Sequence, residues 1–338
     1  MRVDQLSVEQ IAGQRLMVGF DGTTLTGDLK YLIDTVKVGG VILFSRNIEG
    51  PEQLKELCHG VRDHALSVGQ PPLFIAVDQE GGEVARLRAP FTEFNGNPSM
   101  KDEADAVNFA TITAGELKSV GINMNMAPVM DVACTDVDSI MAGRSFGSDP
   151  EQAARLGGAM IDQFQKNGIM AVAKHFPGIG RTTLDSHIDR PFLKTGADTM
   201  MAADIIPFAA AIAHQVAGIM FSHIVYEGFD PQWPASLSPV IAVDLLRKKL
   251  GYNGLVLTDD LDMGAVKKYY PLDVVINQVM AADVDQALIC HRSSDIEDAA
   301  AKIASIQQDT RGMRDQALKS VERILMLKSR FLQPEKTG

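Results

Sequence analysis

Eight short apolar segments recur along the chain, and longer stretches with a helical spacing of apolar residues separate them. The apolar segments are nearly continuous in Val, Ile, Leu, Met and Ala, which is typical of strands buried on both faces. They span residues 16–20, 39–44, 73–78, 124–129, 169–175, 219–224, 255–259 and 286–290. The clearest helical stretches between them are 51–68, 102–119, 150–166, 198–214, 242–250 and 272–282.

This alternation predicts a parallel sheet with right-handed helical crossovers. Eight strands is the number that closes a (β/α)8 TIM barrel, and an open doubly wound sheet is the alternative. A length of 338 residues fits one large domain or two small ones, but no low-complexity linker divides the chain. We therefore predict a single-domain α/β TIM barrel over residues 1–332, with a closing helix at 313–332 and a flexible tail at 333–338.

The overall charge excludes some partners. The chain has 43 Asp and Glu against 32 Lys and Arg, a net charge of -11. Nucleic acids and anionic membranes both require basic patches, so neither is expected as the main partner. The three cysteines are far apart, and no apolar run follows a basic start. We expect no signal peptide, no membrane insertion and a cytoplasmic location.

Ionisable side chains stand at the carboxyl ends of five predicted strands. In a barrel these ends meet at one mouth, where active sites are built. Five such strands make an enzyme a better interpretation than a structural scaffold. The strand-end polar residues are Asp78, Asp131, Lys174, His175, Ser222, His223, Asp259 and Asp260.

The loop at 177–187 follows the strand that ends in Lys174 and His175, and it is rich in Gly and polar residues. Asp185 and His187 lie two positions apart in it. On a loop, this spacing lets the carboxylate reach the imidazole, fix its tautomer and raise its basicity. The pair therefore suits a proton carrier near neutral pH.

Three chemistries fit these residues. Lys174 could form a Schiff base with a carbonyl substrate. Alternatively, Asp259 could act as a carboxylate nucleophile with His187 as general acid/base, as in a retaining glycosidase whose second carboxylate is replaced by histidine. The third chemistry is a metal site, for which the candidate ligands are Asp78, His175, His187, His223 and Asp259.

Five motifs in order along the chain resemble those of the glycoside hydrolase family 3 β-N-acetylhexosaminidases. As a set they are highly specific, and the likeness runs from about residue 10 to about residue 330. The motifs are AVDQEGG at 76–82 with Arg86 downstream, GRSFGSDP at 143–150, KHFPG at 174–178 followed by DSH at 185–187, PASLS at 234–238, and TDDLDMGA at 258–265.

The resemblance implies a TIM barrel and a retaining hydrolysis that needs no cofactor and no metal. Carried over to this chain, it makes Asp259 the nucleophile and His187 the acid/base, oriented by Asp185. Asp260 is expected to be structural. The residues implied to bind the sugar are Asp78, Arg86, Arg144, Lys174 and His175, whose cations should make the pocket locally positive.

By this resemblance the chain is expected to be a retaining exo-β-N-acetylglucosaminidase. Its substrate would be a carbohydrate with a terminal β-linked N-acetylglucosamine, from peptidoglycan-derived muropeptides, and the protein is expected to be a monomer. Four alternatives stay open: a phosphorylase of the same family, another β-glycosidase, a metal-dependent TIM-barrel hydrolase, and a catalytically silent sugar-binding barrel.

Three residues depart from the family pattern. Ile179 stands where the family commonly has histidine in the catalytic loop, and Arg181 follows it. Asp283 stands where the family commonly has glycine, so the backbone there is expected to change, because Asp lacks glycine's freedom at positive φ. Two aromatic residues, Trp233 and Tyr226, are expected to pack beneath a loop.

Overall fold

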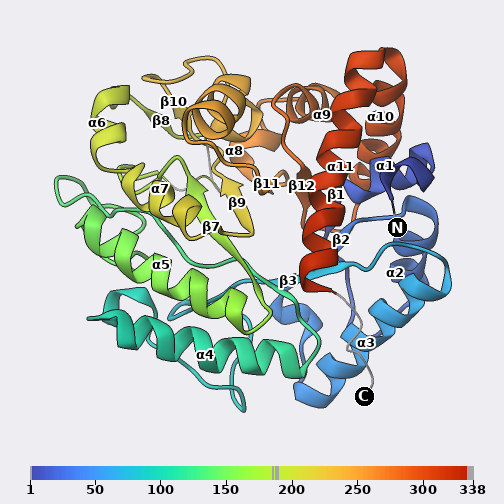
Figure 1. Cartoon of the computed structure of the whole chain (residues 1–338), viewed down its shortest axis with the longest axis horizontal. Coiled ribbons are helices and arrows are strands. Elements are labelled where there is room, and N and C mark those ends of the chain that lie inside the picture. Colours follow the sequence, from blue (N-terminus) through green and yellow to red (C-terminus); the bar gives the residue numbers. More distant parts are fainter. Residues whose placement is uncertain (1, 185, 187–189, 333–338) are drawn as a thin grey trace.

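The computed structural model describes residues 2–184, 186 and 190–332. Its core is a closed barrel of eight strands, in which each strand pairs in parallel with its neighbours (Figure 1). This confirms the predicted TIM barrel and excludes the open sheet. In order around the barrel the strands are β1 (Leu16–Val18), β12 (Gln286–Ile289), β11 (Leu255–Asp260), β9 (Gly218–Phe221), β7 (Met170–Phe176), β6 (Met124–Asn125), β3 (Phe74–Val77) and β2 (Gly40–Leu43).

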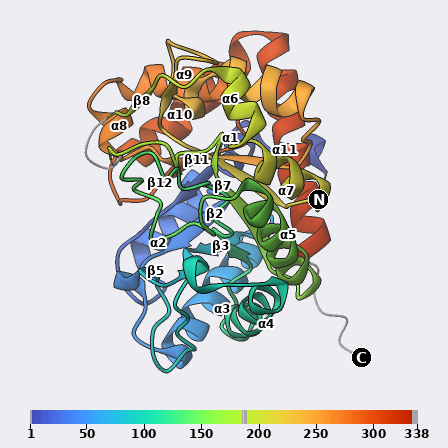
Figure 2. The ribbon, with the colours of Figure 1, turned by 90° about the vertical axis from the view of Figure 1, so that its left-hand side faces the viewer.

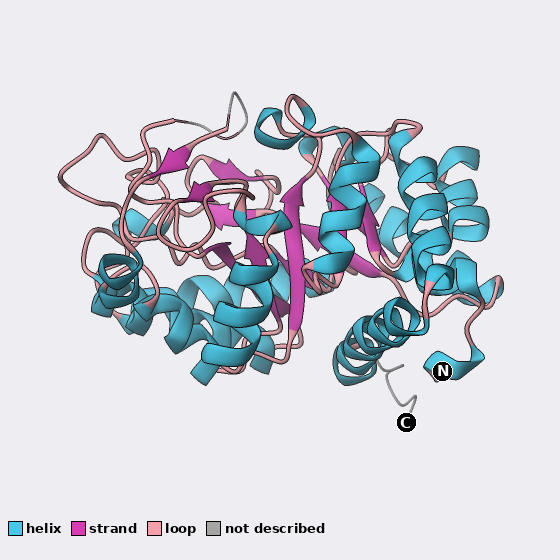
Figure 3. Cartoon of the chain, turned by 90° about the horizontal axis from the view of Figure 1, so that it is seen from above, coloured by secondary structure: helices cyan, strands magenta, loops and turns pink. Residues whose placement is uncertain are grey.

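Helices surround the strands, as the view from above makes plain (Figure 3). Two short two-stranded sheets stand apart from the barrel: β4 (Gln79–Gly81) with β5 (Val84–Ala85), and β8 (Phe192–Leu193) with β10 (Val225–Tyr226). The α-helices are α1 (Val8–Gln14), α2 (Gly27–Tyr31), α3 (Pro51–Ser67), α4 (Glu103–Ser119), α5 (Pro150–Lys166), α6 (Ala197–Ala202), α7 (Ile206–Ala213), α8 (Gly264–Lys267), α9 (Leu272–Ala281), α10 (Asp295–Asp309) and α11 (Arg311–Phe331).

Helix α5 illustrates how local sequence sets these boundaries. The Asp149 side chain accepts a hydrogen bond from the Glu151 N–H at 3.0 Å, and Pro150 occupies the first turn. Gly168 follows the helix with a φ of 86°, a conformation that glycine adopts without penalty. The predicted helix at 150–166 is therefore confirmed.

Two predicted helices differ from the structure. The stretch 198–214 forms two helices, α6 and α7, because Pro207 lies in the first turn of α7 and cannot occupy a helix interior. The stretch predicted at 242–250 begins earlier and is a π-helix, Val240–Lys249. Apolar spacing alone does not distinguish these hydrogen-bonding patterns.

Helix α11 closes one end of the barrel, as predicted for the C-terminal helix. Its Ile324 and Leu327 join the apolar cluster inside the strands. Lys328 from the same helix is buried, and its ammonium donates to the Gln14 side chain at 2.6 Å and to the Gly39 carbonyl at 2.8 Å. The other end, where the strands terminate, is therefore the end available for a site.

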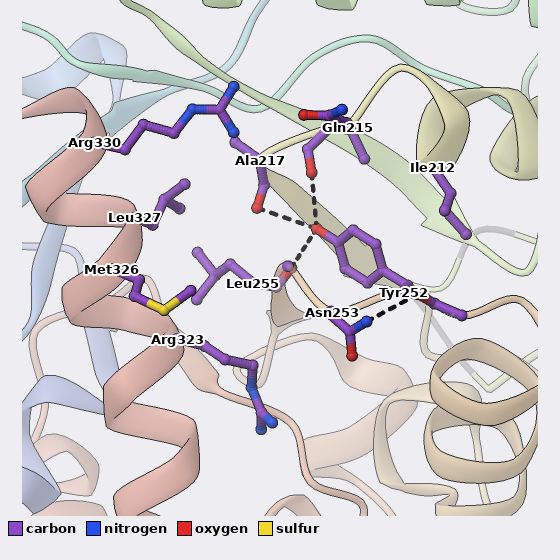
Figure 4. Close-up of a pocket in the computed structure, with 13 residues that line it drawn as sticks. Ile212, Gln215, Ala217, Tyr252, Asn253, Leu255, Arg323, Met326, Leu327 and Arg330 are labelled. Carbon is purple, nitrogen blue, oxygen red and sulfur yellow. Dashed lines mark hydrogen bonds between the residues drawn. The ribbon is translucent and has the colours of Figure 1, made fainter.

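A hollow of about 300 Å³ lies at the closed end, beside the amino ends of β9 and β11 (Figure 4). The Tyr252 hydroxyl reaches into this region and lies 3.1–3.2 Å from the carbonyl oxygens of Val216, Ala217 and Leu255. Arg323 of α11, also on its wall, forms ion pairs with the partly exposed Asp283 and the buried Asp285. The Arg323 ion pairs join α11 to the barrel, which is a structural role typical of this face.

Asp283 adopts a φ of 52°, so it occupies the left-handed region although it is not glycine. Its carboxylate accepts from Arg323 at 2.7 Å, and the buried Asp285 accepts from Arg323 at 2.8 Å and from Arg247 at 2.8 Å. Asp283 thus adopts the positive-φ conformation although it is not glycine, and its carboxylate is ion-paired there.

Among the described residues, we find no helix with both the length and the apolar character needed to cross a membrane.

Candidate active site

A cavity of about 150 Å³ opens at the carboxyl ends of the strands. The structure brings together there all five residues expected to bind a sugar and the expected nucleophile. Asp185 and His187 lie outside the described residues. The ionisable residues on the cavity wall are Asp78, Glu80, Arg86, Arg144, Lys174, His175, Asp259 and Asp260, and the other lining residues are Ile42, Phe44, Val84, Met220, Leu288 and Cys290.

Strand ends and one hairpin place these side chains. Asp78 directly follows β3, Lys174 and His175 lie near the end of β7, and Asp259 lies near the end of β11. Gln79 holds the β4–β5 hairpin, because its side-chain oxygen accepts from the backbone N–H of Arg86 at 2.9 Å and of Leu87 at 3.0 Å.

The Lys174 ammonium joins two acidic residues on the cavity wall. Its Nζ lies 2.7 Å from Asp78 Oδ1 and 2.7 Å from Glu80 Oε1. Arg144 donates to both oxygens of Glu80, at 2.7 and 3.0 Å, and Arg86 donates to Asp78 at 3.3 Å. Three cations and two carboxylates thus form one connected network.

This network keeps its members charged. Burial by itself raises the pKa of Asp78, but Lys174 and Arg86 outweigh it, so the pKa of this carboxyl lies well below its usual range. Burial also opposes ionisation of Glu80, yet Lys174 and Arg144 bring its pKa below the usual value. For Lys174, burial lowers the pKa, whereas Asp78 and Glu80 raise it above the ordinary value of a lysine.

The cavity is not locally positive as the sequence suggested. Among its described lining residues, the four carboxylates of Asp78, Glu80, Asp259 and Asp260 outnumber the three cations. Within the network, each of the three cations has Asp78 or Glu80 as an ion-pair partner.

His175 is oriented from behind by Asp131, which is completely buried. Asp131 Oδ2 lies 2.8 Å from the Nδ1 atom of His175 and accepts its backbone N–H at 3.2 Å, and Oδ1 accepts the Ile179 N–H at 2.8 Å. Because a carboxylate only accepts, Nδ1 carries the proton. One carboxylate therefore fixes both His175 and the start of the loop at 177–187.

The two departures in that loop have defined contacts. Ile179 is buried, and the Asp131 contact uses its backbone rather than its side chain. Arg181 donates from Nε to the buried carboxylate of Asp204 at 2.8 Å. The loop start is thus anchored by a backbone hydrogen bond and an ion pair.

Asp259 and Asp260 have different surroundings. Asp259 accepts the N–H of Asp260 at 2.8 Å and faces the cavity. Asp260 accepts the N–H groups of Asp262 and Cys290, both at 3.0 Å. Burial raises the pKa of Asp260 to about 6, and the neighbouring carboxylates of Asp262 and Asp259 add to the shift. The carboxyl of Asp260 therefore has a structural role, because it holds the backbone at Asp262 and Cys290 by hydrogen bonds.

His223 and Tyr226 belong to the supporting structure. His223 Nε2 donates to the Asp260 carbonyl at 2.9 Å, and its Nδ1 lies 2.7 Å from the Ser236 hydroxyl. Tyr226 is fully buried and donates to the Gly178 carbonyl at 3.0 Å. Trp233 is partly buried against the core and lies 5.3 Å from Tyr270 between ring centroids. Tyr226 is buried as expected, whereas Trp233 remains partly exposed.

Sequence reasoning missed one residue of the site, Glu80. It named Asp131 but missed the role of that residue. Glu80 lies two positions after Asp78, and alternate residues of an extended chain share a face, so this spacing was the available signal. The role of Asp131 depends on three donors that fold onto it, and its position at a strand end did not reveal them.

One group of side chains among the described residues has the spacing of metal ligands. Atoms of Asp260, Asp262 and His291 lie within 4.8 Å of one another. Asp262 also accepts from the Lys267 ammonium at 2.7 Å, so a cation of the chain already neutralises it. His175 and His223, which the sequence offered as metal ligands, have hydrogen-bond partners in the protein instead.

Comparison with known proteins gives consistent matches. The model of the glycosyl hydrolase family 3 N terminal domain matches residues 4–327. A β-hexosaminidase of Alkalilimnicola ehrlichii is 36% identical over 285 residues, which cover 82% of this chain and 80% of that protein. A β-hexosaminidase of Pseudomonas aeruginosa is 34% identical over 296 residues, covering 86% of this chain and 87% of that protein.

Solved structures of family 3 enzymes superpose on this chain. A family 3 β-N-acetylglucosaminidase from Paenibacillus sp. superposes with a TM-score of 0.93 at 34% identity, over 98% of this chain and 65% of that chain. The chain thus spans slightly less than two thirds of that enzyme. A β-N-acetylhexosaminidase from Beutenbergia cavernae has a TM-score of 0.88 at 31% identity, over 96% of this chain and 99% of that chain.

Replacing Glu80 should destabilise the protein. In Glu80→Gln the buried Lys174 ammonium and Arg144 guanidinium lose one negative charge, and we expect a loss of about 3 kcal/mol in the free energy of unfolding by urea. Glu83→Gln, three residues along and exposed, is the matched control and should change the free energy by less than about 0.5 kcal/mol. Equal stability of the two variants would contradict the network.

Replacing Asp260 should stabilise the protein at high pH only. Its folded-state pKa is about 6, above the unfolded value. The free energy of unfolding of the wild type therefore falls as pH rises between these two pKa values, because ionisation is less favourable in the native state. Asp260→Asn keeps an oxygen for the two backbone donors and removes the charge. Urea titrations should find it about 1–3 kcal/mol more stable than wild type at pH 8, with the difference vanishing near pH 4. A difference that does not vary with pH would refute this reading.

Proposed function

The chain belongs to glycosyl hydrolase family 3, and we propose that it is a retaining exo-β-N-acetylglucosaminidase. Two relatives of 34–36% identity, aligned over most of both chains, are β-hexosaminidases. The observation that carries the proposal is the cavity in which Asp259 stands opposite a charged, hydrogen-bonding network of Asp78, Lys174 and Arg144. A carboxylate nucleophile beside many hydroxyl-binding groups is what a retaining glycosidase requires.

In the first step, Asp259 attacks the anomeric carbon while protonated His187 donates its proton to the leaving oxygen. The carbon–oxygen bond to the leaving group breaks, and a glycosyl ester of Asp259 forms. In the second step, His187 takes a proton from water, the resulting hydroxide attacks the anomeric carbon, and Asp259 leaves as a carboxylate. The stereochemistry at the anomeric carbon is therefore retained. Asp185 is proposed to hold the His187 imidazole in the required tautomer.

The ion network supplies the hydrogen bonds to the sugar. Both oxygens of Asp78 are held by cations, but a carboxylate offers about four lone-pair sites and can still accept from sugar hydroxyls. Lys174, Arg86 and Arg144 donate and cannot accept. Because Glu80 and Asp78 fix these side chains beforehand, little reorganisation is needed as hydrogen bonds strengthen in the transition state.

The charge of the cavity favours water over phosphate as the second nucleophile. In the glycosyl-enzyme, Asp259 is a neutral ester, and the three remaining lining carboxylates of Asp78, Glu80 and Asp260 balance the three cations. The cations are already paired, so none is left uncompensated to attract a phosphate anion. We therefore propose hydrolysis rather than phosphorolysis.

We further propose that the natural substrates are fragments of peptidoglycan, processed by a monomer in the cytoplasm. One barrel supplies every described residue of the cavity, which supports activity as a monomer. The three cysteines are free thiols, with Cys58 and Cys290 buried, which suits a reducing compartment.

A panel of aryl β-glycosides with one common leaving group tests the proposed activity. The N-acetylglucosaminide should be cleaved with a kcat/KM at least about 100-fold above that of the glucoside. The reverse preference would overturn the proposed substrate. Asp259→Asn should abolish turnover, and normal activity of this variant would remove the nucleophile. A chelator should leave the rate unchanged, and phosphate buffer should yield free sugar rather than sugar phosphate.

The role of His187 predicts a dependence on the leaving group. His187→Ala should lose about 10²–10⁴-fold in kcat/KM on an alkyl N-acetylglucosaminide, which needs a proton to depart. The loss should be much smaller on a dinitrophenyl glycoside, whose phenolate leaves without one. Losses of the same size on both substrates would argue against general-acid catalysis by this residue.

A further inference from the structure

Four side chains form a cluster at the mouth of the barrel that the proposed mechanism does not use. The Arg190 guanidinium lies over the Tyr269 ring at 4.5 Å and over the Tyr270 ring at 5.6 Å from the centroids. Arg190 also donates to the Tyr270 hydroxyl. The Trp233 ring lies 5.3 Å from that of Tyr270, tilted by 34°. We call these four residues the aromatic platform.

The aromatic platform is open to solvent. Tyr269 is 44% exposed, and Phe192, two residues after Arg190, is 49% exposed. Trp233 and Tyr270 are only partly buried. Most large aromatic side chains of this chain lie in the core, whereas these rings are grouped at the surface. Exposed groups of apolar side chains commonly mark binding sites.

The platform lies on the segments that also form the active site. Arg190 follows β7, which carries Lys174 and His175, and Trp233 follows β9. Tyr269 and Tyr270 follow β11 and α8, ten and eleven residues after Asp259. Strand β8 and helix α8 lie near one another in two perpendicular views (Figures 1 and 2).

Contacts join the platform to the loop that carries the proposed acid/base. The backbone carbonyl of Ser186 accepts the N–H of Ala265 in α8 at 3.1 Å. Arg190, on the other side of the undescribed residues 187–189, packs on Tyr269 and Tyr270. The two described residues that flank this stretch are thus both held against α8 or the segment that directly follows it.

We propose that the aromatic platform binds the first sugar ring of the leaving group. This inference rests on the proposed function. A pyranose ring presents a face of C–H groups that packs on an aromatic ring, and its edge carries hydroxyls that can accept from a guanidinium. The glycone cavity has a volume of about 150 Å³. An exo-acting enzyme holds only the terminal sugar there, so the sugar of the leaving group lies outside it. Tyr269 offers the most exposed ring for that contact.

Two substrates separate stacking from acid catalysis. One is a β-linked disaccharide of N-acetylglucosamine, and the other is the trifluoroethyl N-acetylglucosaminide. The alcohols that leave have similar acidity, so both substrates need the same protonation, but only the disaccharide has a ring to stack. If the panel above selects another glycosyl group, that group replaces N-acetylglucosamine in both substrates, so an error in the proposed sugar does not affect this test.

Tyr269→Ala should lower kcat/KM about five- to tenfold on the disaccharide and less than twofold on the trifluoroethyl glycoside. Tyr269→Phe keeps the ring and should restore the disaccharide rate. Tyr31→Ala removes a tyrosine of similar exposure from α2 and should change neither rate. An equal loss on both substrates would assign Tyr269 to support of the catalytic loop, and no loss on either would remove it from recognition. Either result would overturn the proposal.

Discussion

The Lys174 ammonium, held between Asp78 and Glu80, is the interaction on which the active site depends. It is buried and lies 2.7 Å from each carboxylate. Either carboxylate alone, buried in this wall, would favour its neutral form. With Lys174 in place all three groups stay charged, and Glu80 in turn holds Arg144 with two hydrogen bonds. One contact thus connects the end of β3, the end of β7 and the segment after β6, and it gives the sugar-binding groups fixed positions.

The barrel separates the roles of its two ends. At the closed end, α11 covers the strands, and Lys328, Asp285 and Arg323 make contacts that join helix to barrel. At the open end, charged groups face a cavity of about 150 Å³. The larger hollow lies at the closed end, which shows that volume alone does not locate the chemistry. The proposed source of the acid/base is the loop after β7, at this open end.

The sequence predicted those features that depend on period and order. Eight buried strands located the barrel, and strand-end residues such as Asp78, Lys174 and Asp259 were expected to meet because parallel strands end together. It did not reveal that Asp78 and Glu80 form ion pairs with the cations, nor that Asp131 fixes His175, because most of these contacts join segments far apart in sequence. The break between α6 and α7 was signalled by Pro207 and overlooked. The apolar pattern did not indicate that Val240–Lys249 forms a π-helix.

The central claim is that Asp259 forms a covalent bond to the sugar. A 5-fluoro N-acetylglucosaminyl fluoride tests it most directly, because the ring fluorine slows both steps while the fluoride leaving group speeds only the first. The glycosyl ester should then accumulate. Intact-mass spectrometry is predicted to find one added glycosyl group per chain, and peptide mapping to place it on Asp259. A chain that consumes the reagent without gaining mass, or a label on another residue, would contradict the account.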